Sequence, residues 1–179
     1  MLLLVGLGNP GSNYTNTRHN IGFKIIDAIN AHFKLSKQKP KFKGLLTTGN
    51  IDEKKIYAIK PLTFMNNSGT AIKELIDYFK IDAKDVFVFH DDMDIDFGKI
   101  KAKFGGSSAG HNGIESIDKF IGKDYSRVRI GIGHPKQKKK VNNHVLEDFK
   151  EDEEEKINEI TENIVKQLPT LIKKKKELF

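Results

Sequence analysis

The sequence predicts an α/β fold: one domain, residues 1–179, in which a mixed, mostly parallel twisted sheet carries helices on both faces. Three observations predict it. Short apolar runs alternate along the chain with longer segments whose apolar residues recur every three or four positions, as strands and helices do in α/β proteins. One pair of strand-like segments is joined by a short polar connection, which indicates an inserted hairpin. With 179 residues and 37% hydrophobic residues, the chain has the usual size for a single domain with a packed core.

The first half of the chain contains two strand regions and two helices. Leu2–Leu7 is an apolar run ended by glycines, which predicts a buried strand, and Ile21–Phe33 places its isoleucines on one helical face. Residues 42–49 and 55–60 predict a hairpin. Asn66–Phe79 has apolar residues at helical spacing and predicts the second helix.

The second half continues the alternation. Val86–Phe89 and Val128–Ile132 predict buried strands, and Ile100–Phe104 alternates apolar residues with lysines, as a half-exposed strand does. A glycine-rich loop before Asn112 leads into a helix marked by Ile114, Ile117 and Ile121. The C-terminal third is helical by its spacing, and Pro169 is expected to end or kink that helix.

The charge and the cysteine count limit the class of protein. Lys and Arg total 31 against 24 Asp and Glu, a net charge of +7, which favours a polyanionic partner; a solvated lysine-rich surface is the alternative. The basic run Lys136–Lys140 lies beside the expected site, whereas Glu147–Glu155 is acidic. The absence of cysteine excludes disulfides and thiolate metal sites. No apolar run approaches the ~20 residues that span a bilayer, so we expect no membrane association and a cytoplasmic location.

Three polar, glycine-containing segments are expected to meet in one cleft. They are Gly6–Gly11, His90–Asp94 and Gly105–Gly113, each directly after an expected strand. Ligands of open α/β sheets bind at the carboxyl ends of the strands. The functional site is therefore predicted at that edge of the sheet.

Two of these segments match short motifs of other protein classes. GLGNPG (Gly6–Gly11) has the glycine spacing of a dinucleotide site, but Ser12–Thr17 predicts a loop where a helix should open on the glycines, and this disfavours a nucleotide site. GSSAG (Gly106–Gly110) has the pattern of a nucleophile elbow between a strand and a helix. A doubly glycine-led loop is unlike a strained elbow, but Ser108 as nucleophile of a hydrolase stays an alternative.

A calcium loop is excluded in the acidic segment. Asp92, Asp94 and Asp96 have the spacing of a calcium-loop start, but Phe97 stands where glycine is required and Lys103 where glutamate is required.

The remaining polar residues at segment ends form a candidate constellation: Asn9, His19, Asn66, Asp91, His111 and Asn112. Each has a structural alternative. Asn9 before Pro10 is a common turn residue, Asn66 is a plausible helix N-cap, and a lone histidine such as His19 is usually a surface or core residue. Asp91 directly follows a buried strand and so sits at the edge where ligands bind.

Taken together, six segments resemble the bacterial-type peptidyl-tRNA hydrolase family, in its order and spacing and over essentially the whole chain. They are VGLGNPG (5–11), Tyr14 with TRHN (17–20), FMNNSG (64–69), HDDMD (90–94), GGSSAGHNG (105–113) and RIGIGHP (129–135). The family is known as a cofactor-free esterase that releases peptides from tRNA. The resemblance therefore implies a monomeric, metal-free hydrolase without cofactor or obligate protein partner, whose substrate is peptidyl-tRNA.

The resemblance also implies a role for each matching residue. His19 is the catalytic histidine, Asp91 is the carboxylate that orients it, and Asn9 acts beside the scissile bond. The substrate-binding residues are Tyr14, Met65, Asn66, His111 and Asn112. Those in contact with tRNA phosphates are Lys101, Lys103, Arg129 and Lys140.

The chemistry of ester hydrolysis suits these residue types. A neutral imidazole can take a proton from water near pH 7, and a carboxylate on its other nitrogen fixes the tautomer and stabilises the imidazolium. Asparagine amides can donate to a developing oxyanion without adding charge. The chain departs from the family at Ile95–Phe97, where a proline-containing turn is usual, and in its lysine-rich C-terminal helices. A non-catalytic RNA-binding module is the alternative from another class.

Overall fold

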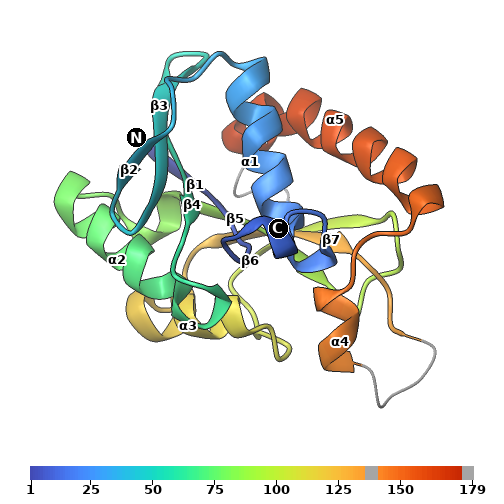
Figure 1. Ribbon diagram of the computed structural model, residues 1–179. Coiled ribbons are helices and arrows are strands. Elements are labelled where there is room, and N and C mark those ends of the chain that lie inside the picture. Colours follow the sequence, from blue (N-terminus) through green and yellow to red (C-terminus); the bar gives the residue numbers. More distant parts are fainter. Residues whose placement is uncertain (136–140, 175–179) are drawn as a thin grey trace.

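A seven-stranded sheet forms the centre of the molecule in the computed structural model, which describes residues 1–135 and 141–174 (Figure 1). The strand order is β2-β3-β4-β1-β5-β7-β6. The strands are β1 (Leu2–Gly6), β2 (Lys39–Lys41), β3 (Gly44–Ile51), β4 (Lys54–Pro61), β5 (Val86–Asp92), β6 (Ile100–Phe104) and β7 (Ser126–Gly131). The four central strands pair in parallel and the flanking pairs are antiparallel. Because β2 is antiparallel to β3, and β3 to β4, five of the seven strands point the same way.

Helices cover both faces of this sheet. The longer helices are α1 (Ile21–His32), α2 (Ser68–Phe79), α3 (Asn112–Ile121) and α5 (Glu151–Lys173). Successive side chains of β1 point to opposite faces of the sheet. Leu2 and Leu4 pack with α1 and α5, whereas Leu3 and Val5 pack with α2 and α3. Figure 1 shows α1 and α5 on one side of the strands and α2 and α3 on the other. The predicted fold class is confirmed.

The start of α1 lies unusually close to the sheet. A Cβ atom on Gly22 would collide with the backbone nitrogen of Leu7 and the backbone oxygen of Phe89. Only glycine permits this approach, because it has no side chain to separate helix from strands. The residues just before α1, which form the 3₁₀ turn η2 (Arg18–Asn20), are therefore held against the ends of β1 and β5.

Three details differ from the sequence-based expectation. The expected hairpin is part of a three-stranded unit, because the short exposed strand β2 pairs with β3. Pro169 does not end the C-terminal helix, which continues to Lys173. The helix persists because buried Leu168 and Ile172, on either side of the proline, pack on the core and offset the lost backbone hydrogen bond.

The third difference concerns the glycine-rich loop. Strand β6 runs antiparallel to β7, and its last residue, Phe104, pairs with Ser126 at the start of β7. The loop therefore leaves the sheet at the amino end of the parallel strands, and the prediction that it follows a strand at their carboxyl end is wrong. It returns so that His111 and Asn112 do reach the carboxyl edge and line the cleft there.

Among the described residues, no helix is both long and apolar enough to cross a membrane.

Candidate active site

A cleft of about 350 Å³ opens at the carboxyl edge of the sheet, beside the ends of β1 and β5. Strands β2, β3 and β4 lie on one side of β1 in the sheet, and β5, β6 and β7 lie on the other. The strand order therefore changes direction at β1, which makes the gap beside β1 and β5 the topological switch point of the sheet. The lining residues come from six segments of the chain: Asn9, His19, Phe64, Met65, Asn66, His90, Asp91, Asp92, Met93, Asp94, Ser108, Ala109, Gly110, His111, Asn112, Asn142, Val145 and Leu146. The six residues of the candidate constellation all lie among them.

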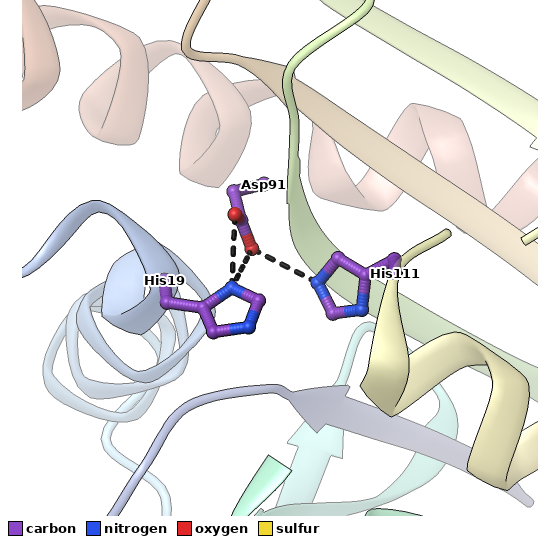
Figure 2. Close-up of side chains that lie close together, drawn as sticks. All are labelled: His19, Asp91 and His111. Atoms are coloured by element: carbon purple, nitrogen blue, oxygen red, sulfur yellow. Dashed lines mark hydrogen bonds and ion pairs between the residues drawn. The ribbon is translucent and has the colours of Figure 1, made fainter. Parts of the chain in front are cut away.

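His19 and Asp91 form a direct pair at the base of this cleft. Nδ1 of His19 lies 2.9 Å from both carboxylate oxygens of Asp91. Asp91 is 2% exposed and His19 is 7% exposed. Since an ionised carboxylate only accepts hydrogen bonds, Nδ1 carries the proton and Nε2 presents a free lone pair. Figure 2 shows Nε2 on the side of the ring turned away from Asp91.

His111 contacts the same carboxylate from the other side (Figure 2). Its Nε2 lies 3.0 Å from Oδ1 of Asp91, and its Nδ1 accepts hydrogen bonds from the backbone N–H groups of Gly113 and Ile114. This arrangement requires the neutral tautomer with the proton on Nε2, because Nδ1 is the N-cap acceptor of α3. His111 thereby links the start of α3 to the carboxylate that holds His19.

These contacts set the protonation states of the pair. Burial alone lowers the pKa of His19, but the charge of Asp91 and the hydrogen bond to it outweigh burial and raise the pKa above the ordinary value of 6.5. Burial acts to raise the pKa of Asp91, but His19 and His111 beside it hold that pKa well below its usual range. Asp91 is therefore ionised throughout the physiological range.

A third histidine, His90, lies behind the pair. Its ring centroid is 5.0 Å from that of His111, and its Nδ1 donates to the backbone carbonyl of Asp91 at 2.8 Å. Burial, with the neighbouring His111, lowers the pKa of His90 to about 3, so its ring is neutral. His90 is a buried packing and hydrogen-bonding group rather than a second base.

Asn9 is fixed in one orientation by its neighbours. Its Oδ1 accepts from the backbone N–H of Met65 at 2.8 Å. Its backbone is paired twice with the Asn20 side chain, which accepts from Asn9 N and donates to Asn9 O. Because Oδ1 is occupied, the Nδ2 donor of Asn9 has no partner among the described residues and is available to a group in the cleft.

His19, Asp91 and His111 are also the one group of three or more histidine or acidic side chains, among the described residues, that could bind a metal ion. Ligand atoms of His19, Asp91 and His111 lie within 4.8 Å of one another. Here both imidazoles direct N–H groups at the carboxylate, and the second nitrogen of His111 caps α3. Hydrogen bonding accounts for the cluster, and a metal ion would have to displace these bonds.

The other expected substrate-binding residues are divided between the cleft and its rim. Met65 forms part of the buried wall, and the exposed Asn66 and Asn112 line the opening. Asn66 lies in the 3₁₀ turn η3 (Met65–Asn67), so it is not the N-cap of α2. Tyr14 does not line the cleft; its ring packs edge-on against Phe64, which does.

Ser108 lines the cleft but lacks the partner of an activated nucleophile. The three histidines that line the cleft with it direct their bonded nitrogens to Asp91 or to the backbone, and none within the described chain is paired with the Ser108 hydroxyl. A serine nucleophile needs a base within hydrogen-bond reach.

Three of the four expected tRNA-binding residues lie together on the β6–β7 edge. Lys101 and Arg129 are directly paired across the two strands, and Lys103 points from β6 to the same face two residues on. Both lysines are exposed, whereas Arg129 is partly buried beside Asp92 at 3.7 Å. Lys140 and the rest of the run 136–140 lie outside the described residues. We call Lys101, Lys103 and Arg129 the β6–β7 basic group.

Several residues of the site were not predicted from the sequence. Asn20 and Arg18 belong to the TRHN segment, but nothing in their spacing assigns them a partner. The short helix α4 (Val141–Leu146) contributes Asn142, Val145 and Leu146 to the cleft, although its sequence has no clear helical signal.

Comparisons with known proteins decide the family. The peptidyl-tRNA hydrolase family model matches residues 3–178. The chain belongs to the peptidyl-tRNA hydrolase family. A peptidyl-tRNA hydrolase of Pelagibacter ubique is 72% identical over 179 residues, covering 100% of this chain and 96% of that protein. One of Ehrlichia ruminantium is 46% identical over 177 residues, covering 99% and 91%.

The solved structures agree with the sequence comparisons. The crystal structure of peptidyl-tRNA hydrolase from Acinetobacter baumannii superposes with a TM-score of 0.92 at 35% identity, covering 98% of this chain and 90% of that one. The family and the hydrolase class predicted from the six motifs are thus confirmed. The assignments of individual residues remain predictions, and their chemistry is argued below.

Proposed function

We propose that this peptidyl-tRNA hydrolase family member cleaves the ester between peptide and tRNA with water that His19 activates. The observation that carries the proposal is the placement of the His19 imidazole. One nitrogen is bonded to a buried carboxylate and the other is free beside the cleft.

In the first step, water attacks the ester carbonyl carbon while Nε2 of His19 takes its proton. Asp91 stabilises the imidazolium that forms, and it holds the ring in the tautomer with Nε2 unprotonated. Such general-base assistance is typically worth ~10²–10⁴-fold in rate. Collapse of the tetrahedral intermediate breaks the bond to the ribose oxygen, which leaves as an alcohol after accepting the proton from His19.

Asn9 supports this step as a neutral donor. Its Nδ2 can donate to the oxygen that becomes negative, and the bond from Met65 N–H to its Oδ1 fixes the amide before substrate arrives. A positioned donor costs no reorganisation in the transition state. Asn66 and Asn112 at the opening offer further amides to the peptide backbone, which every peptidyl-tRNA shares.

The tRNA is bound through its phosphates. The β6–β7 basic group places two exposed lysines and the partly buried Arg129 on one face of the sheet edge. Phosphate contacts position a nucleic acid without reading its bases. We infer that the enzyme accepts many tRNAs and peptides for this reason. We also expect it to act as a monomer in the cytoplasm.

A comparison of two variants tests the proposal. Purified protein is incubated with an N-blocked peptidyl-tRNA, and the ester is measured for the parent, His19→Ala and Ser108→Ala. We expect turnover by the parent and by Ser108→Ala, with loss only in His19→Ala. Loss only in the serine variant would assign the chemistry to Ser108, and an intact ester with the parent would reject the enzymatic function.

A further inference from the structure

Arg18 is a buried charged residue that the mechanism above does not use. It directly precedes His19 in η2, yet its side chain is only 3% exposed and points away from Asp91 toward α4 and α5. A buried guanidinium is costly unless its donors are satisfied. Its partners therefore indicate what it holds in place.

The two terminal nitrogens of Arg18 bind two different helices. One binds α4, which forms part of the cleft wall, and the other binds α5, which follows α4 in the chain. Nη1 donates to the carbonyl of His144 in α4 at 3.1 Å, and Nη2 donates to Oε1 of Glu153 in α5 at 3.1 Å. The carbonyl of His144 is near the carboxyl end of α4, where a positive group is favoured by the helix dipole. The guanidinium thus joins α4 to α5.

Backbone hydrogen bonds also join the chain just before His19 to the chain just after α4. Arg18 N donates to the carbonyl of Glu147 at 3.0 Å, and Phe149 N donates to the carbonyl of Asn16 at 3.1 Å. Thr17 and Asp148 form an isolated antiparallel bridge between these bonds. The chain directly after α4 is therefore paired with the chain directly before His19.

From these contacts we propose that Arg18 is a positioning residue that fixes α4, and with it one wall of the substrate cleft, to the turn that carries His19. The inference rests on the proposed function, because α4 contributes Asn142, Val145 and Leu146 to the cleft in which the ester would bind. Without the guanidinium, the backbone bridge at residues 147–149 remains, so α4 pivots about it instead of detaching.

The two carboxylates at the start of α5 provide a matched pair of variants. Arg18 has two carboxylates beside it: Glu153 at 3.1 Å, and the more exposed Glu147, whose Oε2 lies 3.5 Å from Nη1. Glu153→Gln removes the nearer charge, while the amide oxygen can still accept from Lys150 N as Glu153 does at 2.8 Å. Glu154→Gln changes the same charge in the same helical turn, at an exposed side chain that does not contact Arg18. Arg18→Lys keeps a cation but cannot bind both partners at once.

Steady-state kinetics with peptidyl-tRNA give the first readout. Arg18→Lys should raise KM about tenfold, the scale of one lost charge-assisted hydrogen bond, while kcat and the acid limb of its pH profile stay unchanged. Glu153→Gln should raise KM by less, because the amide oxygen can still accept from Arg18 and only the charge is lost. Glu154→Gln should match the parent. If KM stays unchanged in Glu153→Gln while only the melting temperature falls, Arg18 stabilises the fold without positioning the wall, and the proposal is wrong.

A label on α4 gives a second readout that needs no turnover. The chain has no cysteine, so Asn143→Cys places a single nitroxide on an exposed position of α4 that does not line the cleft. The label should become more mobile when Glu153→Gln is added, and not when Glu154→Gln is added. Equal mobility in the two would overturn the proposal even if Arg18→Lys does not fold. Absence of turnover in the parent would instead reject the proposed function.

Discussion

Replacement of Asp91 by asparagine probes the catalytic pair with almost no change in shape. An amide has one accepting oxygen and one donating nitrogen, whereas the Asp91 carboxylate accepts from His19 on both oxygens and from His111 on Oδ1. The amide oxygen should take the Oδ1 position, because His111 cannot reverse its tautomer without giving up the N-cap bonds of α3. The amide nitrogen then faces Nδ1 of His19.

Nδ1 of His19 lies 2.9 Å from both carboxylate positions, so its N–H can still bond the amide oxygen but now also faces the N–H group of the amide nitrogen. This repulsion favours a tilted ring or the other tautomer. If Nδ1 becomes the acceptor, the proton moves to Nε2 and the ring can no longer accept a proton from water. We therefore expect kcat to fall by ~10²–10⁴-fold, the usual value of general-base assistance, with little change in KM. The free energy of unfolding should fall by only ~1.5–3 kcal/mol, because the packing volume is conserved.

The pH profile gives the sign of the electrostatic effect. His19 acts as a base when it is neutral, so activity falls as the pH drops through its pKa, which Asp91 raises above 6.5. In Asp91→Asn the negative charge is gone and burial remains, so the acid limb of the residual activity should move to lower pH. Rates are measured on one peptidyl-tRNA over a pH series, with folding monitored by circular dichroism. A variant with kcat within about fivefold of the parent and an unmoved acid limb would refute the role of the pair.

Three other changes test separate parts of the account. Asn9→Asp keeps the oxygen that accepts from Met65 N–H but replaces the Nδ2 donor with a buried negative charge, so kcat should fall by ~10²–10³-fold or more; an unchanged kcat would remove Asn9 from the oxyanion contacts. Alanine at each position of the β6–β7 basic group should raise KM and reduce the dependence of KM on salt concentration. Lys166→Ala, at an exposed position of α5, is the control and should change neither. An unchanged salt dependence of KM in the basic-group variants would reject phosphate contact. Gly22→Ala should destabilise the protein by ~3 kcal/mol or more in urea unfolding, because its Cβ meets backbone of two strands; a loss below ~1 kcal/mol would mean that α1 can move away from the sheet.

The fold was predictable where the chain repeats a simple pattern. The buried strands β1 and β5 are continuous apolar runs, and α1 and α2 carry their buried residues at helical spacing. Strand β2 has no such signal, because its three residues are exposed and it exists through its pairing with β3. Pro169 misled because tertiary packing of α5 outweighs the local preference of one residue.

The candidate site was predictable as a set of residues but not as a network. The six motifs supplied His19, Asp91, Asn9 and His111, and the structure brings the first two into contact. Local spacing could not show that His111 shares the same carboxylate oxygen, since the two residues are 20 positions apart and the connecting chain crosses the sheet and returns. The role of Arg18 depends on partners more than 120 positions away, which only the folded chain brings near it.

The claim that His19 is the base is tested most directly by ¹⁵N NMR titration of that one imidazole. The account predicts that Nδ1 is protonated and Nε2 is not at alkaline pH, and that the ring titrates above pH 6.5 at the same pKa as the acid limb of kcat/KM. A proton on Nε2, or a His19 pKa that differs from the kinetic pKa, would contradict it.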